Sequence, residues 1–147
     1  MRSEKEISYR LRLAQGFLAE AQQDIPLKRW RSAVDNSQLA VENAAKAVLA
    51  MLGPVGRTHN PATQLLQSIT DGRFTPIPVP PLQRLAELAR LLGADIHAQT
   101  DYGIEATRRT PWELFGEADG QQAVAVAEEA VDLATTITQY RQEGGDI

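Results

Sequence analysis

Two residues in the second half of the chain could act together in acid–base chemistry, namely Arg90 and His97. A histidine titrates near neutral pH and an arginine fork matches a phosphate, so the pair could hold a phosphate and move the proton of an attacking 2′-hydroxyl. On an unbroken helix the two would lie within about 20° of each other and about 10.5 Å apart along the axis. Direct cooperation would need a bend, which Gly93 could permit. The simpler interpretation is an exposed helix face that carries an arginine and a histidine.

A second group of basic residues could bind an anion or a nucleotide. These side chains come from two loops that we expect to be neighbours: Arg57, His59, Arg108 and Arg109. Trp112 and Phe115 follow closely in the chain. Arginine forks fit phosphate, and an aromatic ring beside them could stack on a base. The alternative is a solvated basic turn, with Trp112 closing the end of the molecule.

Glu42 and Lys46 form a third pair, spaced four residues apart. They could be a catalytic acid and base, but this order and spacing on a helix favours a structural ion pair, which could be buried where helices meet. The alanines around them indicate packing in the core or in a dimer. The sequence contains no glycine-rich phosphate loop, nucleophile elbow or metal-binding motif.

The composition excludes several kinds of site. A chain of 147 residues fits one domain, and the absence of cysteine removes disulfides, thiolate catalysis and cysteine-ligated zinc together. Because only two histidines are present, a metal site would depend on carboxylates, and we expect neither a metal nor a cofactor. The net charge of −4 argues against a generally basic surface but not against a local basic patch. No apolar run reaches membrane-spanning length and the N-terminus is charged, so we expect a soluble cytoplasmic protein.

One long helix, predicted at residues 27–52, must organise whatever site is present. Apolar and small residues cover roughly half of its circumference, which is wider than an ordinary amphipathic stripe. Pro26 stands before its start and Gly53-Pro54 after its end, as is typical of helix boundaries. Leu39 and Ala50 fall on the polar side, so a second subunit could cover part of that side.

Other helices are predicted around it from apolar spacings of three and four residues. The predicted helices cover residues 3–24, 27–52, 60–69, 81–99 and 121–141. Ser3 and Glu6 have the capping-box spacing, and Asn60 precedes a proline at a helix start. Residues 71–80 form a proline-rich crossover and residues 100–120 an irregular segment. We therefore predict an all-α, up-and-down antiparallel bundle of about five helices, as one domain with a core at residues 3–141 and a frayed tail at 142–147.

The core of the long helix resembles the signature helix of the HEPN domain family. That signature has Gln, Glu and Lys among alanines and aliphatic residues, as in the run from Gln38 through Glu42 and Lys46 to Leu49, QLAVENAAKAVL. Thr58-His59-Asn60 stands where the family often has Thr-His before Asp or Asn. The run YGIEATRRTP, ending at Pro111, stands where the family tends to have aromatic residues followed by Arg-Tyr-Pro. The resemblance covers residues 8–138 in the right order.

The resemblance implies a helical bundle, usually dimeric, that forms toxin–antitoxin or nucleotide-binding pairs with a small nucleotidyltransferase. Some branches of the family are metal-independent RNases with an Arg-x(4–6)-His motif completed across the dimer, and Arg90 and His97 are at the outer limit of that spacing. The sequence departs from the active pattern, because Leu91 follows the arginine directly and no His-x-Tyr ending is present. Thr110 also replaces the aromatic residue of Arg-Tyr-Pro.

These observations lead to three hypotheses. The first is a non-catalytic HEPN-like dimer that binds a nucleotide or acts as the partner of a nucleotidyltransferase. The second is a metal-independent RNase toxin that uses Arg90 and His97 on RNA. The third is a plain protein-interaction module, which would neither bind nucleotide nor cleave RNA.

Overall fold

The computed structural model describes residues 4–58 and 60–143, and these residues fold as a helical bundle. Its α-helices are α1 (Glu4–Asp24), α2 (Trp30–Leu49), α3 (Pro61–Thr70), α4 (Val79–Leu91), α5 (Ala94–Tyr102), α6 (Pro111–Leu114) and α7 (Glu117–Glu143), with a 3-10 turn at Glu105–Thr107. The described chain contains no strand, only an isolated bridge between Ile104 and Arg109. The predicted all-α bundle is confirmed.

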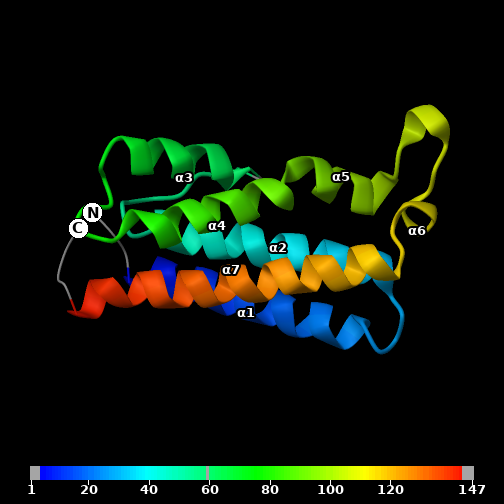
Figure 1. The fold of residues 1–147 in the computed structure, drawn as a ribbon, viewed down its shortest axis with the longest axis horizontal. Helices are drawn as coiled ribbons and strands as arrows, with labels where there is room; N and C mark the ends of the chain where they lie inside the picture. The colour runs from blue at the N-terminus through cyan, green and yellow to red at the C-terminus, as the bar shows by residue number, and fades with distance from the viewer. Residues whose placement is uncertain (1–3, 59, 144–147) are drawn as a thin grey trace.

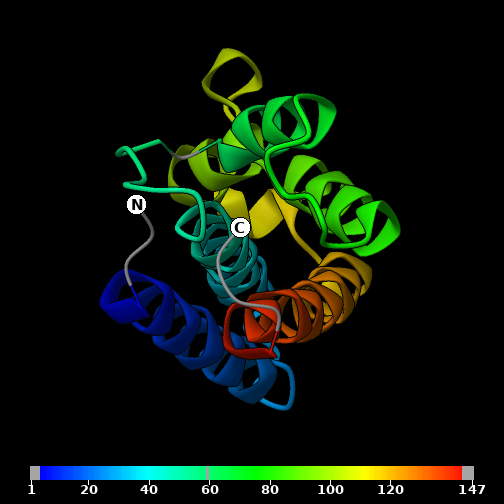
Figure 2. The same cartoon turned by 90° about the vertical axis from the view of Figure 1, so that its left-hand side faces the viewer.

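Helix α2 lies at the centre of the bundle. In Figure 1, α1, α2 and α7 run along the length of the molecule, and α3, α4 and α5 lie over one side of them. The view along the bundle in Figure 2 shows α2 surrounded by α1, α7, α4 and α3. Helix α2 packs against every other helix of the described chain, so its position fixes the arrangement of the rest.

The seams of the two long flanking helices face this centre as predicted. On α1, Ile7, Ala14 and Ala21 are fully buried. On α7, the buried residues recur at helical spacing: Ala123, Ala127, Ala130, Ala134 and Ile137. Small side chains let helix backbones approach closely, which explains how α1, α2 and α7 pack together over their full length.

The polar side of α2 is also buried in the second half of the helix, which corrects the predicted amphipathic pattern there. Glu42, Asn43, Lys46 and Ala50 are all at most 5% exposed within the single chain. The surrounding helices of the same molecule therefore cover this side, and no second subunit is needed to explain Ala50. Leu39 remains half-exposed.

Glu42 and Lys46 form an ion pair in the interior. Lys46 Nζ lies 3.1 Å from Glu42 Oε2, and the two side chains are 6% and 5% exposed. Gln38 Nε2 donates a hydrogen bond of 3.3 Å to the other oxygen of Glu42. Gln38, Glu42 and Lys46 all belong to α2. The buried charges of this helix are therefore paired mainly with groups of the same helix.

The start of α2 lies later than predicted, at Trp30 instead of Leu27. The preceding residues form a tight turn in which Lys28 adopts a left-handed conformation with φ 58°. In this turn the Lys28 amide donates to the Ile25 carbonyl and the Arg29 amide donates to the Asp24 carbonyl, both at 3.0 Å. The side chain of Leu27 is consequently exposed.

The predicted single helix at residues 81–99 is wrong, because the structure divides it into α4 and α5. Helix α4 ends at Leu91, and Leu92 then leaves helical geometry with φ −113° and ψ 64°. Gly93 is the N-cap of α5, and its carbonyl accepts from the amides of Ile96 and His97. A glycine inside a helix destabilises the helix by about 1 kcal/mol relative to alanine. Ending α4 before Gly93 therefore sacrifices little helix stability.

The segment predicted as irregular, residues 100–120, is more regular than expected. Helix α5 continues to Tyr102, and α6 and the first residues of α7 lie within the same segment. Asn60 occupies the N-cap position of α3 with Pro61 first in the helix, as predicted, but its side chain makes no capping hydrogen bond. The capping box at Ser3 and the tail from residue 144 lie outside the described residues. None of the helices in the described chain has the length and apolarity needed to cross a membrane.

The buried ion pair gives a first prediction. Replacing Lys46 with Met should lower the free energy of unfolding by about 3–5 kcal/mol, because the Glu42 carboxylate would lose its buried counter-charge. Adding Glu42→Gln should restore part of the loss, since a neutral amide needs no cation and still accepts from Gln38. Urea unfolding followed by circular dichroism measures both values.

The exposed ion pair between Arg84 and Glu129 is the matched control. Their side chains are 47% and 42% exposed, so Arg84→Gln should leave the unfolding midpoint nearly unchanged. Equal effects of Lys46→Met and Arg84→Gln would show that the interior pair does not stabilise the fold in the way described.

Candidate functional site

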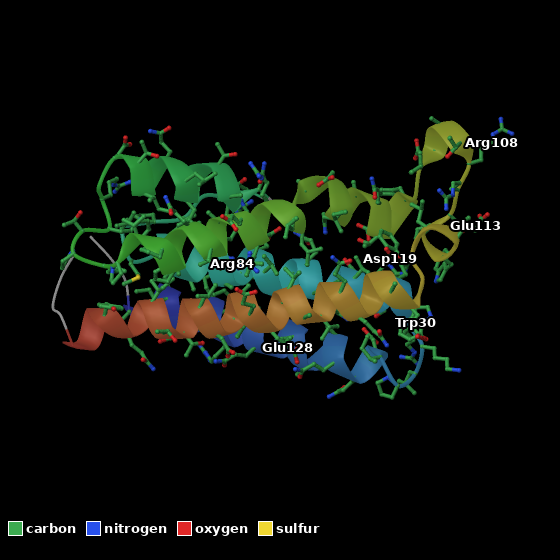
Figure 3. All side chains as sticks on the ribbon, in the orientation of Figure 1. Trp30, Arg84, Arg108, Glu113, Asp119 and Glu128 are labelled. Atoms are coloured by element: carbon green, nitrogen blue, oxygen red, sulfur yellow. The ribbon has the colours of Figure 1, made fainter. Side chains whose placement is uncertain are left out.

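A cleft opens at the end of the bundle where the α1–α2 turn meets α6 and the start of α7. Figure 3 shows Trp30 and Glu113 at this end of the molecule. The cavity has a volume of about 590 Å³. Basic and aromatic side chains dominate its lining: Lys28, Arg29, Trp30, Arg31, Ser32, Trp112 and Phe115. None of these described residues is acidic, and we call the cavity the cationic–aromatic cleft.

The turn before α2 and the packing of α7 together position Trp30. A Cβ atom on Gly120 would lie 3.0 Å from Cε3 of Trp30 and 3.5 Å from its Cα. A larger residue at position 120 would therefore press on the Trp30 side chain, and the glycine lets α7 approach the first turn of α2 closely. The indole is held between two helices while Lys28 and Arg29 stay exposed beside it.

Arg31 connects three elements at the wall of the cleft. Its NH1 donates a hydrogen bond of 2.8 Å to the carbonyl of Thr100, at the end of α5. Its guanidinium carbon lies 5.5 Å from the centre of the Trp112 ring, in cation–π contact. The Thr100 hydroxyl in turn lies 3.2 Å from Asp35 Oδ1 on α2. Arg31 is thus fixed in place and still presents a positive charge to the cleft.

Helix α6 presents Trp112 to solvent. Thr110 caps this helix: its hydroxyl accepts from the Glu113 amide at 3.3 Å, and Glu113 Oε1 accepts from the Thr110 amide at 3.1 Å. The hydrogen bonds from the Thr110 backbone and hydroxyl lower the pKa of Glu113 below its ordinary value. Trp112 is 72% exposed on this capped turn, so one face of its ring remains accessible to a ligand.

Arg108 and Arg109 line a different cavity of about 300 Å³, whose wall also includes Thr110 and Pro111. The Ile104 amide donates to the Arg109 carbonyl at 2.9 Å and the Arg109 amide returns a bond of 3.1 Å, which closes a small loop. Arg108, with φ 56°, stands at the tip of this loop and projects outward in Figure 3. The cavity also contains the acidic residue Glu105.

The predicted grouping of basic residues is therefore changed by the structure. Trp112 and Phe115 line the cationic–aromatic cleft, whereas Arg108 and Arg109 line the neighbouring cavity. Arg57 is exposed and lines neither of these cavities. In Figure 1 the segment leading into α3 lies over the other half of the molecule. His59 lies outside the described residues.

Arg90 and His97 do not share a helix. Arg90 is exposed in the last turn of α4, and His97 is half-buried in α5, beyond the break at Leu92–Gly93. The helical geometry assumed for the pair is therefore wrong, although a joint role for them stays a prediction. The described residues contain no group of three histidine, aspartate or glutamate side chains that could hold a metal ion.

The residues that sequence reasoning missed are the basic ones at the start of the long helix. Lys28, Arg29 and Arg31 flank Trp30 in the run KRWR, which is the densest basic–aromatic run in the chain. The sequence shows this run, but it does not enter the predicted anion site, which is built on Arg57, His59, Arg108 and Arg109. The run gives no sign of the contact between Arg31 and Trp112, because Trp112 lies more than eighty positions later in the chain.

The sequence itself matches a known family over most of its length. The family model of the HEPN domain matches residues 7–139. The chain belongs to the HEPN domain family. The match extends one residue beyond the predicted resemblance at each end and includes every residue of the cationic–aromatic cleft. Comparison with curated proteins and with solved structures gave no match.

The loop of this HEPN chain that carries Arg108 and Arg109 gives a second prediction. Gly103 has φ +69° and ψ −145°, and a Cβ there would overlap the Arg109 carbonyl oxygen. Gly103→Ala should therefore cost about 1–3 kcal/mol locally and open the loop. Amide hydrogen exchange at Ile104 and Arg109 should accelerate, while the helical content measured by circular dichroism should be retained.

Gly56→Ala is the control for this substitution. Nothing lies within 4 Å of a Cβ built at Gly56, so the same chemical change in another loop should alter exchange at neither position. Unchanged protection at Ile104 and Arg109 in Gly103→Ala would contradict the strained geometry on which the loop depends.

Proposed function

We propose that this HEPN protein is a non-catalytic nucleotide-binding subunit, with the phosphates of the nucleotide held in the cationic–aromatic cleft. The observation that carries the proposal is the lining of that cleft by three cationic side chains, with Trp30 and Trp112 beside them and no acidic residue among the seven. Arginine forks bind phosphate oxygens in pairs, and a tryptophan ring offers a stacking surface to a base.

The size and charge of the cleft support a nucleotide over a simple ion. A volume of about 590 Å³ lies within the usual range of about 300–1,000 Å³ for small-molecule sites. The chain as a whole has a net charge of −4, so a general attraction for anions is not expected. Binding at this end therefore depends on the local cluster of Lys28, Arg29 and Arg31.

We further propose that the subunit dimerises and pairs with a small nucleotidyltransferase, as a toxin–antitoxin-type partner. Membership of the HEPN family supports this part of the proposal. Exposed apolar side chains on α3 and α4, namely Leu66 and Val79, offer surface for such contacts. This assembly would leave the cationic–aromatic cleft, at the end of the bundle, free to bind its ligand.

Tryptophan fluorescence provides a direct test of nucleotide binding. The chain has only two tryptophans, Trp30 and Trp112, and both line the cleft. Titration with a nucleoside triphosphate should quench their emission to a plateau, after correction for absorption by the nucleotide. Arg29→Gln should weaken binding about tenfold or more, because it removes a charged hydrogen-bond donor.

Arg12→Gln is the matched control, since Arg12 is an exposed arginine on α1, away from the cleft. It should leave the affinity unchanged, whereas added salt should weaken binding to the unmodified protein by screening the phosphate contacts. Quenching that never saturates, or equal affinities for Arg29→Gln and Arg12→Gln, would overturn the proposed site.

The assembly has its own test. Light scattering of the purified protein should give the mass of a dimer, and a nucleotidyltransferase should co-purify from the native host. A stable monomer that carries no partner would contradict the proposed pairing and leave the nucleotide site to be judged by the fluorescence titration alone.

A further inference from the structure

A smaller apolar pocket adjoins the cationic–aromatic cleft at Phe115. Its volume is about 180 Å³, and Phe115 lines both cavities. The other walls are apolar side chains from α2, the α4–α5 break and α7: Val34, Leu91, Leu92, Ile96, Ala123 and Val126. Phe115 is therefore a wall that the charged cleft and the apolar pocket have in common.

Two polar side chains on the first turns of α7 stand at the edge of this pocket. Asp119 and Gln122 both line it, and both are exposed residues. They are three positions apart on the helix, so they lie on the same face. Asp119 Oδ2 accepts a hydrogen bond of 2.9 Å from the Gly116 amide, which holds the carboxylate at the start of α7. Figure 3 shows Asp119 at the same end of the molecule as Trp30.

We propose that this pocket is the base subsite of the nucleotide site and that it selects guanine. The inference rests on the proposed function, because the phosphates must occupy the cationic–aromatic cleft for the base to reach past Phe115. A volume of about 180 Å³ is below the usual size of a complete small-molecule site and suits a fragment such as one planar base. Apolar walls and an aromatic ring are the surfaces on which proteins stack an extruded base.

The polar edge of the pocket determines which base fits. Guanine presents two adjacent N–H donors, at N1 and N2, next to a carbonyl acceptor at O6. A carboxylate only accepts hydrogen bonds, so Asp119 matches the two donors, and the amide of Gln122 can donate to O6. Adenine would turn the lone pair of its N1 toward the Asp119 carboxylate. A site of this kind rejects the analogue strongly, because its own polar groups are left unpaired.

The test compares nucleotides that carry the same triphosphate group and differ in their base. Affinities of the full chain are measured by calorimetry for GTP, ITP, ATP and inorganic triphosphate. GTP should bind at least about tenfold more tightly than ATP, and ITP, which lacks the N2 amino group, should fall between them. Asp119→Asn should remove most of the preference for GTP while keeping the affinity for inorganic triphosphate, and an unchanged preference in that variant would overturn the proposal.

Two further variants serve as controls for the proposed base subsite. Asp132→Asn, an exposed acidic residue further along α7, should leave the preference intact. Val126→Phe should fill the pocket and reduce every nucleotide to the affinity of inorganic triphosphate. Should that variant fail to fold, Gln122→Glu at the exposed rim serves instead, because a second carboxylate facing O6 should weaken the binding of GTP and ITP, which both carry O6, and not that of ATP.

The outcomes separate this proposal from the proposed function. Absence of binding by all four probes overturns the phosphate site and the base subsite together. Equal binding of GTP and ATP, both sensitive to Arg29→Gln, overturns the base subsite and leaves the proposed function standing. A change of oligomeric state in Val126→Phe without any change in base preference assigns the pocket to a protein interface and overturns the proposal.

Discussion

The ion pair between Glu42 and Lys46 is the interaction on which the arrangement of the bundle depends. Helix α2 packs against every other α-helix of the described chain, and the second half of α2 is buried on all sides, including Glu42 and Lys46. Two charges can be buried only when they compensate each other, and here they lie one turn apart on the same helix at 3.1 Å. The compensation is still incomplete, since Ser37 Oγ and Gln38 Oε1 are buried with no partner among the described residues. A helix that must keep this polar pair buried can adopt few other rotations about its own axis. The direction in which its first turn projects is therefore fixed.

That first turn forms a wall of the cleft, and its position supports the proposed binding of an anion there. The N-terminus of a helix carries a partial positive charge from its unpaired amides, and no side chain caps α2, whose N-cap residue is Arg29. Lys28 and Arg31 add full charges within the same turn. The acidic residues nearest to them are already engaged: Asp24 accepts from Ser32 and Asn36, and Asp35 accepts from Thr100. The residues that line the cleft therefore carry a positive charge, although the chain as a whole is negative.

Sequence reasoning succeeded where structure follows local periodicity and failed where it depends on contacts between distant segments. The fully buried alanines of α1 and α7 fall at the apolar spacings of three and four residues from which these helices were predicted. The burial of Asn43 on the predicted polar face was missed, since Arg10 of α1 reaches it with a hydrogen bond of 3.2 Å and no periodicity reports such a contact. The cleft was missed for the same reason. It joins Arg31 to Trp112, and neither residue alone indicates the other.

The break at Leu92–Gly93 shows how one local feature decides between two kinds of chemistry. A continuous helix would have aligned Arg90 with His97 and extended the α4 surface. Instead the chain restarts at Ala94, and α5 packs against α2. This brings the Thr100 carbonyl within 2.8 Å of Arg31, which holds that guanidinium in contact with Trp112. The turn that separates the acid–base pair thus builds the wall of the cationic–aromatic cleft. An arginine held at one end by a backbone carbonyl and stacked on an exposed ring is arranged to bind an anion, and this is the physical basis for favouring binding over catalysis.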